Sequence, residues 1–131
     1  MVYLTNKLEL IFDELDSEFE KSCVPIRSHF AAVSQVKELL ETQQWQSCVI
    51  SKKKAKKISE ILERDIPLYD YKDISLREGD MIIEYIDYPL AVDEADLTDN
   101  AKKILDLMRF EIIEIVKYQH APSVLSVEAM I

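Results

Sequence analysis

The apolar residues of this chain follow two different spacings, and this alternation restricts the fold more than any other feature of the sequence. In four segments they recur every three or four residues, which is the period of one face of a helix. Those segments begin near Leu8, Ile26, Ala55 and Ala101. Other stretches are β-branched runs, and isoleucine and valine together contribute 24 residues (15 Ile and 9 Val), which favours strands. Helices and strands in separate stretches predict an α+β fold.

The first two helical stripes predict an N-terminal antiparallel helix pair within residues 1–44. Asn6 and Glu9 resemble a capping pair before the first stripe, and Pro25 precedes the second. The connection at 22–24 is short, which favours antiparallel packing of the two helices. The stripes consist of Leu8, Ile11, Phe12, Leu15 and Phe19, and of Ile26, Phe30, Val33, Val36 and Leu40.

Residues 45–131 are expected to form an α/β part of the same single domain, with a small mixed or antiparallel sheet and two further helices. Ser51 is expected to cap the first of these helices, and Thr98 or Asp99 to begin the second. Strands are predicted where β-branched runs end at turn residues. They cover 46–50, 66–74, 81–86 and 110–118, and the last is expected to pair with 124–131 as a hairpin. The length of 131 residues is typical of one domain.

An all-α bundle is the alternative fold. The chain has a single glycine, Gly79, and scarce glycine suits helices. Ser75 and Glu78 form a second candidate capping pair, which would open a helix over 76–88. Residues 110–118 also continue the helical stripe before them. We favour the α+β fold.

Charge is distributed unevenly along the sequence. The whole chain carries a net charge of −9, whereas residues 51–64 contain six basic and two acidic side chains, a local net charge of +4. Five lysines occupy the first two turns of the helix that Ser51 is expected to cap, where the helix dipole disfavours positive charge. This lysine cluster consists of Lys52, Lys53, Lys54, Lys56 and Lys57.

Three interpretations of the lysine cluster are open. Ser51, the lysines and the free N–H groups of a helix start could hold a phosphate group or a nucleic-acid backbone. The acidic loop at 93–99 could instead fold over the lysines, or they could form an ordinary solvated face. The sequence contains neither GxxxxGK[ST] nor GxGxxG, so no standard nucleotide-binding loop supports the first interpretation.

No other motif predicts an active site. The acidic residues of 80–99 do not match the spacing of a calcium-binding loop. Asp70 and Lys72 have the D-x-K form found in metal-dependent nucleases, which makes a small metal-dependent hydrolase the third functional alternative. Cys23 and Cys48 are expected to be small buried hydrophobes. We predict no catalytic residue, no metal and no cofactor.

The preferred hypothesis is a small acidic, non-enzymatic protein that acts by binding a larger protein. It would serve as an inhibitor, an immunity-like protein or an accessory subunit of an assembly, because acidic surfaces steer association with basic partners. The candidate protein contacts are Asp13, Glu14, Asp16, Glu20 and Trp45. The first alternative is a phosphate or nucleic-acid contact module built on Ser51 and the lysine cluster. An uncovered strand edge would also permit homo-oligomers.

The sequence shows no targeting signal that would direct the chain out of the cytoplasm. The first residues lack the basic and apolar regions of a signal peptide, and the apolar stretches are too short to span a membrane. The chain has two cysteines and no CxxC spacing, which is typical of a reducing compartment. We therefore expect a cytoplasmic protein without membrane contact.

Overall fold

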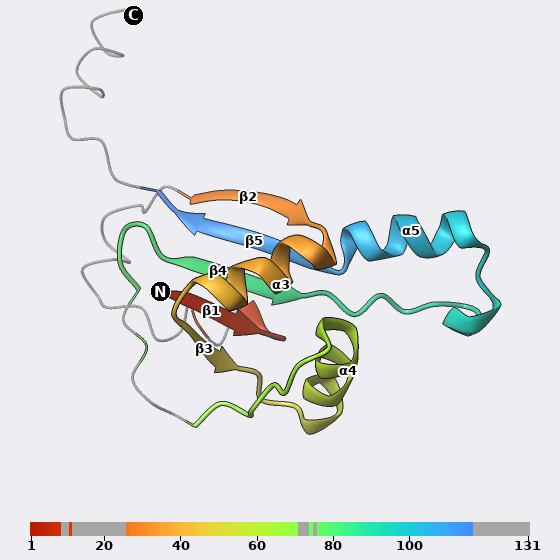
Figure 1. The fold of residues 1–131 in the computed structure, drawn as a ribbon, viewed down its shortest axis with the longest axis horizontal. Coiled ribbons are helices and arrows are strands. Elements are labelled where there is room, and N and C mark those ends of the chain that lie inside the picture. Colours follow the sequence, from red (N-terminus) through yellow and green to blue (C-terminus); the bar gives the residue numbers. More distant parts are fainter. Residues whose placement is uncertain (9–10, 12–25, 71–73, 75, 117–131) are drawn as a thin grey trace, which may run out of the picture.

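A computed structural model describes residues 1–8, 11, 26–70, 74 and 76–116, and these residues form an α+β fold with one mixed sheet (Figure 1). Within these residues, five strands build the sheet, and three α-helices of ten or eleven residues pack on it or extend from it. The elements are β1 (Val2–Thr5), β2 (Ile26–Ala31), α3 (Val33–Thr42), β3 (Trp45–Cys48), α4 (Lys52–Leu62), β4 (Met81–Tyr85), the short 3₁₀ helix η1 (Glu94–Asp96), α5 (Asp99–Met108) and β5 (Phe110–Ile115).

The strand order is β2-β5-β4-β1-β3. Strand β1 runs parallel to both of its neighbours, with Val2 opposite Met81 of β4 and opposite Trp45 of β3. Strand β5 is antiparallel to β4 and to β2. The carboxyl ends of β1, β3 and β4 therefore lie at one edge of the sheet.

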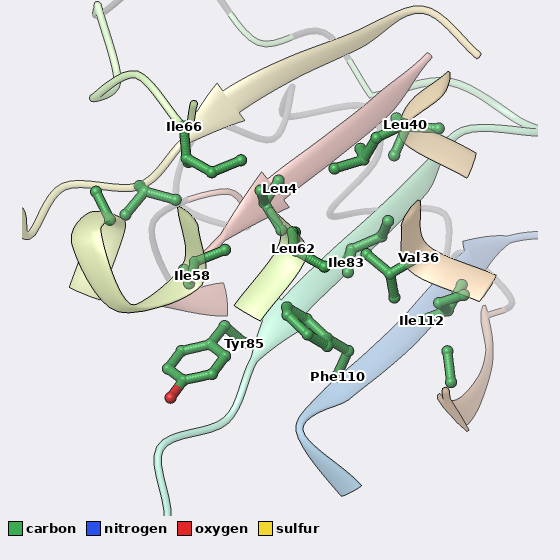
Figure 2. Packing of buried hydrophobic residues seen from close by; sticks show 14 residues of the cluster. Leu4, Val36, Leu40, Ile58, Leu62, Ile66, Ile83, Tyr85, Phe110 and Ile112 are labelled. Carbon is green, nitrogen blue, oxygen red and sulfur yellow. The ribbon is translucent and has the colours of Figure 1, made fainter. Parts of the chain in front are cut away.

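Two apolar clusters cover the two faces of the sheet. On one face, α3 and α4 pack against β1, β4 and β5; Figure 2 shows Val36 and Ile58 directed toward Ile83 and Phe110. On the other face, Leu8 and Ile11 belong to a second cluster, together with Tyr3, Cys48, Tyr69, Ile74, Leu76, Ile82 and Ile113. Strand β1 is consequently covered on both sides, which explains why Val2–Thr5 is nearly all apolar.

The predicted N-terminal helix pair is wrong. Strand β1 comes first, and the stripe from Ile26 to Leu40 is divided into strand β2 and helix α3. Strand β2 pairs with β5 near the other end of the described chain, so long-range pairing overrides the local helical spacing. Ile26 and Phe30 are 53% and 50% exposed, and they are not the buried face of a helix. Of the first predicted helix, Leu8 and Ile11 are helical, and the rest lies outside the described residues.

The predictions for the second part of the chain agree better with the structure. Helix α4 begins at the predicted cap, where the Ser51 hydroxyl accepts the Lys54 N–H at 3.3 Å. Helix α5 begins after Thr98, whose hydroxyl accepts the Ala101 N–H at 3.2 Å. Strands β4 and β5 lie within the segments predicted as strands at 81–86 and 110–118, and β3 overlaps the segment predicted at 46–50 but begins one residue earlier, at Trp45.

The all-α alternative and the edge strand predicted at 66–74 both disagree with the structure. The sheet excludes the all-α bundle, and a helix over 76–88 is replaced by a turn at Gly79 and strand β4. Gly79 has φ of +88°, a conformation that side-chain-bearing residues rarely adopt. The described residues of the segment predicted as an edge strand, 66–70 and 74, are irregular, and the Tyr69 N–H donates to the Val49 carbonyl at 2.8 Å. The predicted hairpin partner, 124–131, lies outside the described residues.

Within the described part of the chain, no helix combines the length and the apolar character that crossing a membrane requires.

The packing predicts how stability depends on position. Ile83 is fully buried in the cluster of Figure 2, whereas Ile104 on α5 is 59% exposed. We expect Ile83→Ala to lower the free energy of unfolding by about 2–5 kcal/mol, because it removes buried methyl groups and leaves a cavity. Ile104→Ala, the matched control, is expected to change it by less than about 0.5 kcal/mol. Urea denaturation followed by circular dichroism measures both, and equal losses would contradict the assigned core.

Candidate anion site at the carboxyl edge of the sheet

Strands β1 and β3 are adjacent and parallel, but the chain leaves them toward opposite faces of the sheet. After β1, Leu8 and Ile11 join the cluster on one face. After β3, helix α4 packs on the other face through Ile58 and Leu62. In open α/β sheets this divergence leaves a crevice outside the carboxyl ends of the two strands, and ligands bind there. The surface at this position here is formed by Asn6 and by residues 50–54, and we refer to it as the β1–β3 crevice after this general rule.

Hydrogen bonds fix the two sides of the β1–β3 crevice to each other. The Asn6 side-chain oxygen accepts the Ile50 N–H at 2.9 Å. The buried Thr5 hydroxyl lies 3.2 Å from the Cys48 carbonyl oxygen and accepts the Lys7 N–H at 3.0 Å. These contacts hold the start of α4 in a defined position beside the end of β1.

Backbone donors face this region at the start of α4. The Ser51 hydroxyl and carbonyl accept the N–H groups of Lys54 and Ala55, at 3.3 and 2.8 Å. The N–H groups of Lys52 and Lys53 have no acceptor among the described residues. Two unpaired N–H groups and the positive end of the helix dipole therefore lie at the crevice, an arrangement that attracts anions.

The lysine cluster is mostly free of internal partners. Lys52, Lys53 and Lys56 are exposed, while Lys54 and Lys57 are half-buried. Lys57 forms an ion pair with Asp87 at 3.1 Å, and the other four lysines have no carboxylate partner among the described residues. Within the described part of the chain, the cluster thus presents four ammonium groups without an ion pair.

The described acidic loop at 93–99 does not pair with the lysine cluster. Its Glu94 instead binds the Arg109 guanidinium at 3.1 Å, and Asp106 binds the same group at 2.7 Å. Burial lowers the pKa of Arg109, but hydrogen bonds and charge from these two carboxylates outweigh it and raise the pKa overall. Asp87, the one described carboxylate that pairs with the cluster, lies outside the loop.

The pKa of Lys57 reflects its partners. Burial lowers this pKa, but hydrogen bonds and charge interactions with Asp87 and Tyr85 outweigh the effect and raise it overall. The ammonium group is therefore charged throughout the physiological pH range. Burial is also the main reason that the pKa of the Tyr85 hydroxyl is raised, so Tyr85 is a neutral neighbour of Lys57.

Trp45 does not belong to the β1–β3 crevice. It begins strand β3, while Ser51 follows the other end of that strand. Its ring is half-buried against the apolar cluster, and the Arg64 guanidinium lies 5.1 Å from its centroid. The other candidate protein contacts, Asp13, Glu14, Asp16 and Glu20, lie outside the described residues.

The described thiol and imidazole groups do not form a catalytic arrangement. Cys48 is a buried free thiol, and burial, with a smaller contribution from Asp70, raises its pKa to about 12. His29 lies on the exposed edge strand β2 and not on a helix. Lys72 of the D-x-K motif, Cys23 and His120 are outside the described residues. Among the residues that the structure describes, no group of three or more His, Cys, Asp or Glu could hold a metal ion.

Helix α5 exposes apolar residues. Their helical spacing in the sequence is the same as that of a buried helix face, so the sequence alone did not indicate that they are exposed. It extends beyond the sheet (Figure 1), and none of its residues is fully buried. Ile104 and Leu107 are 59% and 56% exposed. Beside it lies an open groove of about 430 Å³, which we call the α5 groove. It is lined by Ala101, Ile104, Leu105 and Met108 of α5 and by Tyr88, Pro89, Leu90 and Leu97.

Sequence reasoning found the lysine cluster and its Ser51 cap but missed Asn6 and Asp87. Asn6 was interpreted as a helix cap, although the apolar and β-branched run Val2–Thr5 directly before it is a strand signal. Asp87 follows a predicted strand, but its distance of thirty residues from Lys57 gives no local signal of their contact.

Comparison with known proteins supports the fold only. Neither a family model nor a curated protein matches the chain. A solved structure, B116 of Sulfolobus turreted icosahedral virus, is similar with a TM-score of 0.58 and 12% sequence identity. The match covers 86% of this chain and 97% of that chain. At this identity, the chain shares its arrangement of strands and helices with B116.

Proposed function

We propose that the chain binds a small phosphate-bearing ligand in the β1–β3 crevice. The carrying observation is that the carboxyl ends of β1 and β3, the N–H groups of Lys52 and Lys53, and four lysines coincide at one edge of the sheet, and that neither these N–H groups nor these lysines have a partner among the described residues. Each of these features is common alone. Together they supply the backbone donors and the cationic side chains that phosphate oxygens require.

The charge of the whole chain favours a short ligand over a long nucleic acid. With a net charge of −9, the surface away from residues 51–64 repels an extended polyanion. A ligand with one to three phosphates would contact the lysine cluster alone. Ile50, which is 41% exposed beside the cluster, offers apolar surface to an organic part of such a ligand.

We further propose that this protein binds its ligand without transforming it, and that it does so in the cytoplasm. The buried Cys48 thiol, with a pKa near 12, is protonated at neutral pH and is therefore a poor nucleophile. A reduced buried thiol is also what a reducing compartment maintains.

Replacing two exposed lysines of the cluster tests the proposal. We expect Lys52→Gln/Lys53→Gln to weaken pyrophosphate binding about tenfold at about 0.1 M salt, because it removes two charge-assisted contacts. Isothermal titration calorimetry measures the affinity, and the wild-type affinity should fall as salt is added.

The matched control is Lys102→Gln/Lys103→Gln, which removes the same charge from exposed positions on α5. Its affinity for pyrophosphate should stay within about twofold of wild type, because charges beyond about 10 Å are largely screened at 0.1 M salt. Equal effects of the two variants, or a wild-type chain that does not bind pyrophosphate, would refute the proposed function.

Binding to another protein is the second candidate function, and the exposed apolar surface of α5 favours it. Ile104, which is 59% exposed, lines the α5 groove, and Leu107 of the same helix is 56% exposed. Contiguous apolar surface of this kind often marks a protein contact. The acidic first-helix residues predicted as contacts could act with it, and a second copy of the chain is one admissible partner.

A charge placed on α5 tests this second function. We expect Ile104→Lys to lose any specific protein partner that the wild-type chain retains, because burying an unpaired ammonium group is costly. Leu68→Lys, at another apolar position that is 38% exposed, is the control and should retain the partner. Sedimentation velocity detects a second copy, and affinity capture detects other proteins. Retention by Ile104→Lys would contradict a role for α5.

A further inference from the structure

We infer that strand β2 pairs with β2 of a second copy of this chain, so that two sheets join edge to edge as antiparallel partners. This inference is independent of the proposed phosphate binding. Strand β2 is the outermost strand on one side of the sheet (Figure 1). It pairs with β5 on its inner side, and no described strand pairs with its outer side. The backbone N–H and C=O groups of such an outer side are a template for another strand.

The other edge of the sheet, strand β3, is covered by the chain itself. The Tyr69 N–H donates to the Val49 carbonyl at 2.8 Å, directly after the end of β3. The Ser47 hydroxyl of β3 donates to the Pro67 carbonyl. Residues 66–70 therefore lie along β3, and the two edges of one sheet differ.

Strand β2 lacks the features that usually prevent an edge strand from pairing. Such edges are protected by very short strands, by proline or by unpaired charge. Strand β2 has six residues and no proline, and its Arg27 is paired with Glu114 of β5 at 3.5 Å. Its first five residues are exposed, with Ile26 and Phe30 at 53% and 50%. An exposed strand with two exposed apolar side chains favours contact with another strand.

The sequence of β2 is complementary to itself in one antiparallel register. Ile26, Ser28 and Phe30 alternate along the strand and therefore lie on the same face of the sheet. A two-fold axis through Ser28, perpendicular to the sheet, places each Ile26 opposite Phe30 of the second copy. Aromatic and β-branched side chains in opposite positions form favourable cross-strand pairs. An axis through His29 would instead place Phe30 opposite Ser28, so the register through Ser28 is the better one.

The charge of β2 permits contact between two copies. Two chains with a net charge of −9 each repel one another. Residues 26–31 contain no acidic side chain, although the chain has 25. Pairing at β2 therefore places no carboxylate in the two strands that meet. Added salt should strengthen this association, because it screens the repulsion between the two acidic chains.

Sedimentation velocity over a range of protein concentrations tests the pairing. Because two six-residue strands form a small contact, we expect a wild-type dimer with Kd on the order of 10–100 μM. Phe30→Lys should weaken it at least about tenfold, because each new ammonium group lies opposite Ile26 of the other copy. Ile104→Lys, the matched control at an exposed apolar position on α5, should leave Kd within about twofold of wild type.

A charge exchange tests the register. Ile26→Glu should also weaken association, but a mixture of Ile26→Glu and Phe30→Lys chains should form a heterodimer. In that heterodimer the new carboxylate and ammonium groups are opposite each other, and one Ile26–Phe30 pair is retained. Recovery in the mixture would also show that both variants fold. The control mixture, Ile26→Lys with Phe30→Lys, places two ammonium groups opposite each other and should not recover.

Three results would overturn the inference. The first is a wild-type chain that stays monomeric at about 1 mM, well above the expected Kd. The second is a dimer that Ile104→Lys abolishes and Phe30→Lys retains, which would place the contact on α5. The third is a mixture of Ile26→Glu and Phe30→Lys that associates no better than the control mixture, which would exclude pairing through Ser28.

Discussion

Burial of strand β1 on both faces is the constraint on which the rest of the structure depends. Its four residues are between 0% and 5% exposed, because one apolar cluster covers each side of the sheet. A strand enclosed in this way needs chain on both faces, and it is parallel to both neighbours. Parallel neighbours require crossover connections. The residues after β1 belong to one cluster, and helix α4, which follows β3, belongs to the other.

The candidate site results from the way the chain leaves the parallel strands β1 and β3. It does not correspond to a known sequence motif. The chain diverges after β1 and β3, and the Asn6–Ile50 hydrogen bond holds the two diverging segments together. The start of α4 then brings unpaired N–H groups and lysines to the same edge. The lysines are placed where the helix dipole opposes them, a local cost that a bound anion would relieve.

Local signals in the sequence were sufficient for the second part of the fold but not for the first. Ser51 and Thr98 act as the predicted caps, because a cap depends on groups within three residues. The helix predicted from Ile26 to Leu40 was wrong because its first half pairs with β5, from Ile26 opposite Ile115 to Ala31 opposite Phe110. Local spacing carries no information about a pairing so distant in the sequence. For the same reason the lysine cluster was found and the contact of Lys57 with Asp87 was not.

The most direct test of this account is a titration of the ¹⁵N-labelled chain with pyrophosphate, observed by amide chemical shifts. The account predicts that the largest shifts occur at the backbone amides of Lys52 and Lys53 and at neighbouring Asn6, Ile50 and Ser51. Saturating shifts at α5 or at Trp45, with residues 50–54 unchanged, would place the anion elsewhere and contradict it.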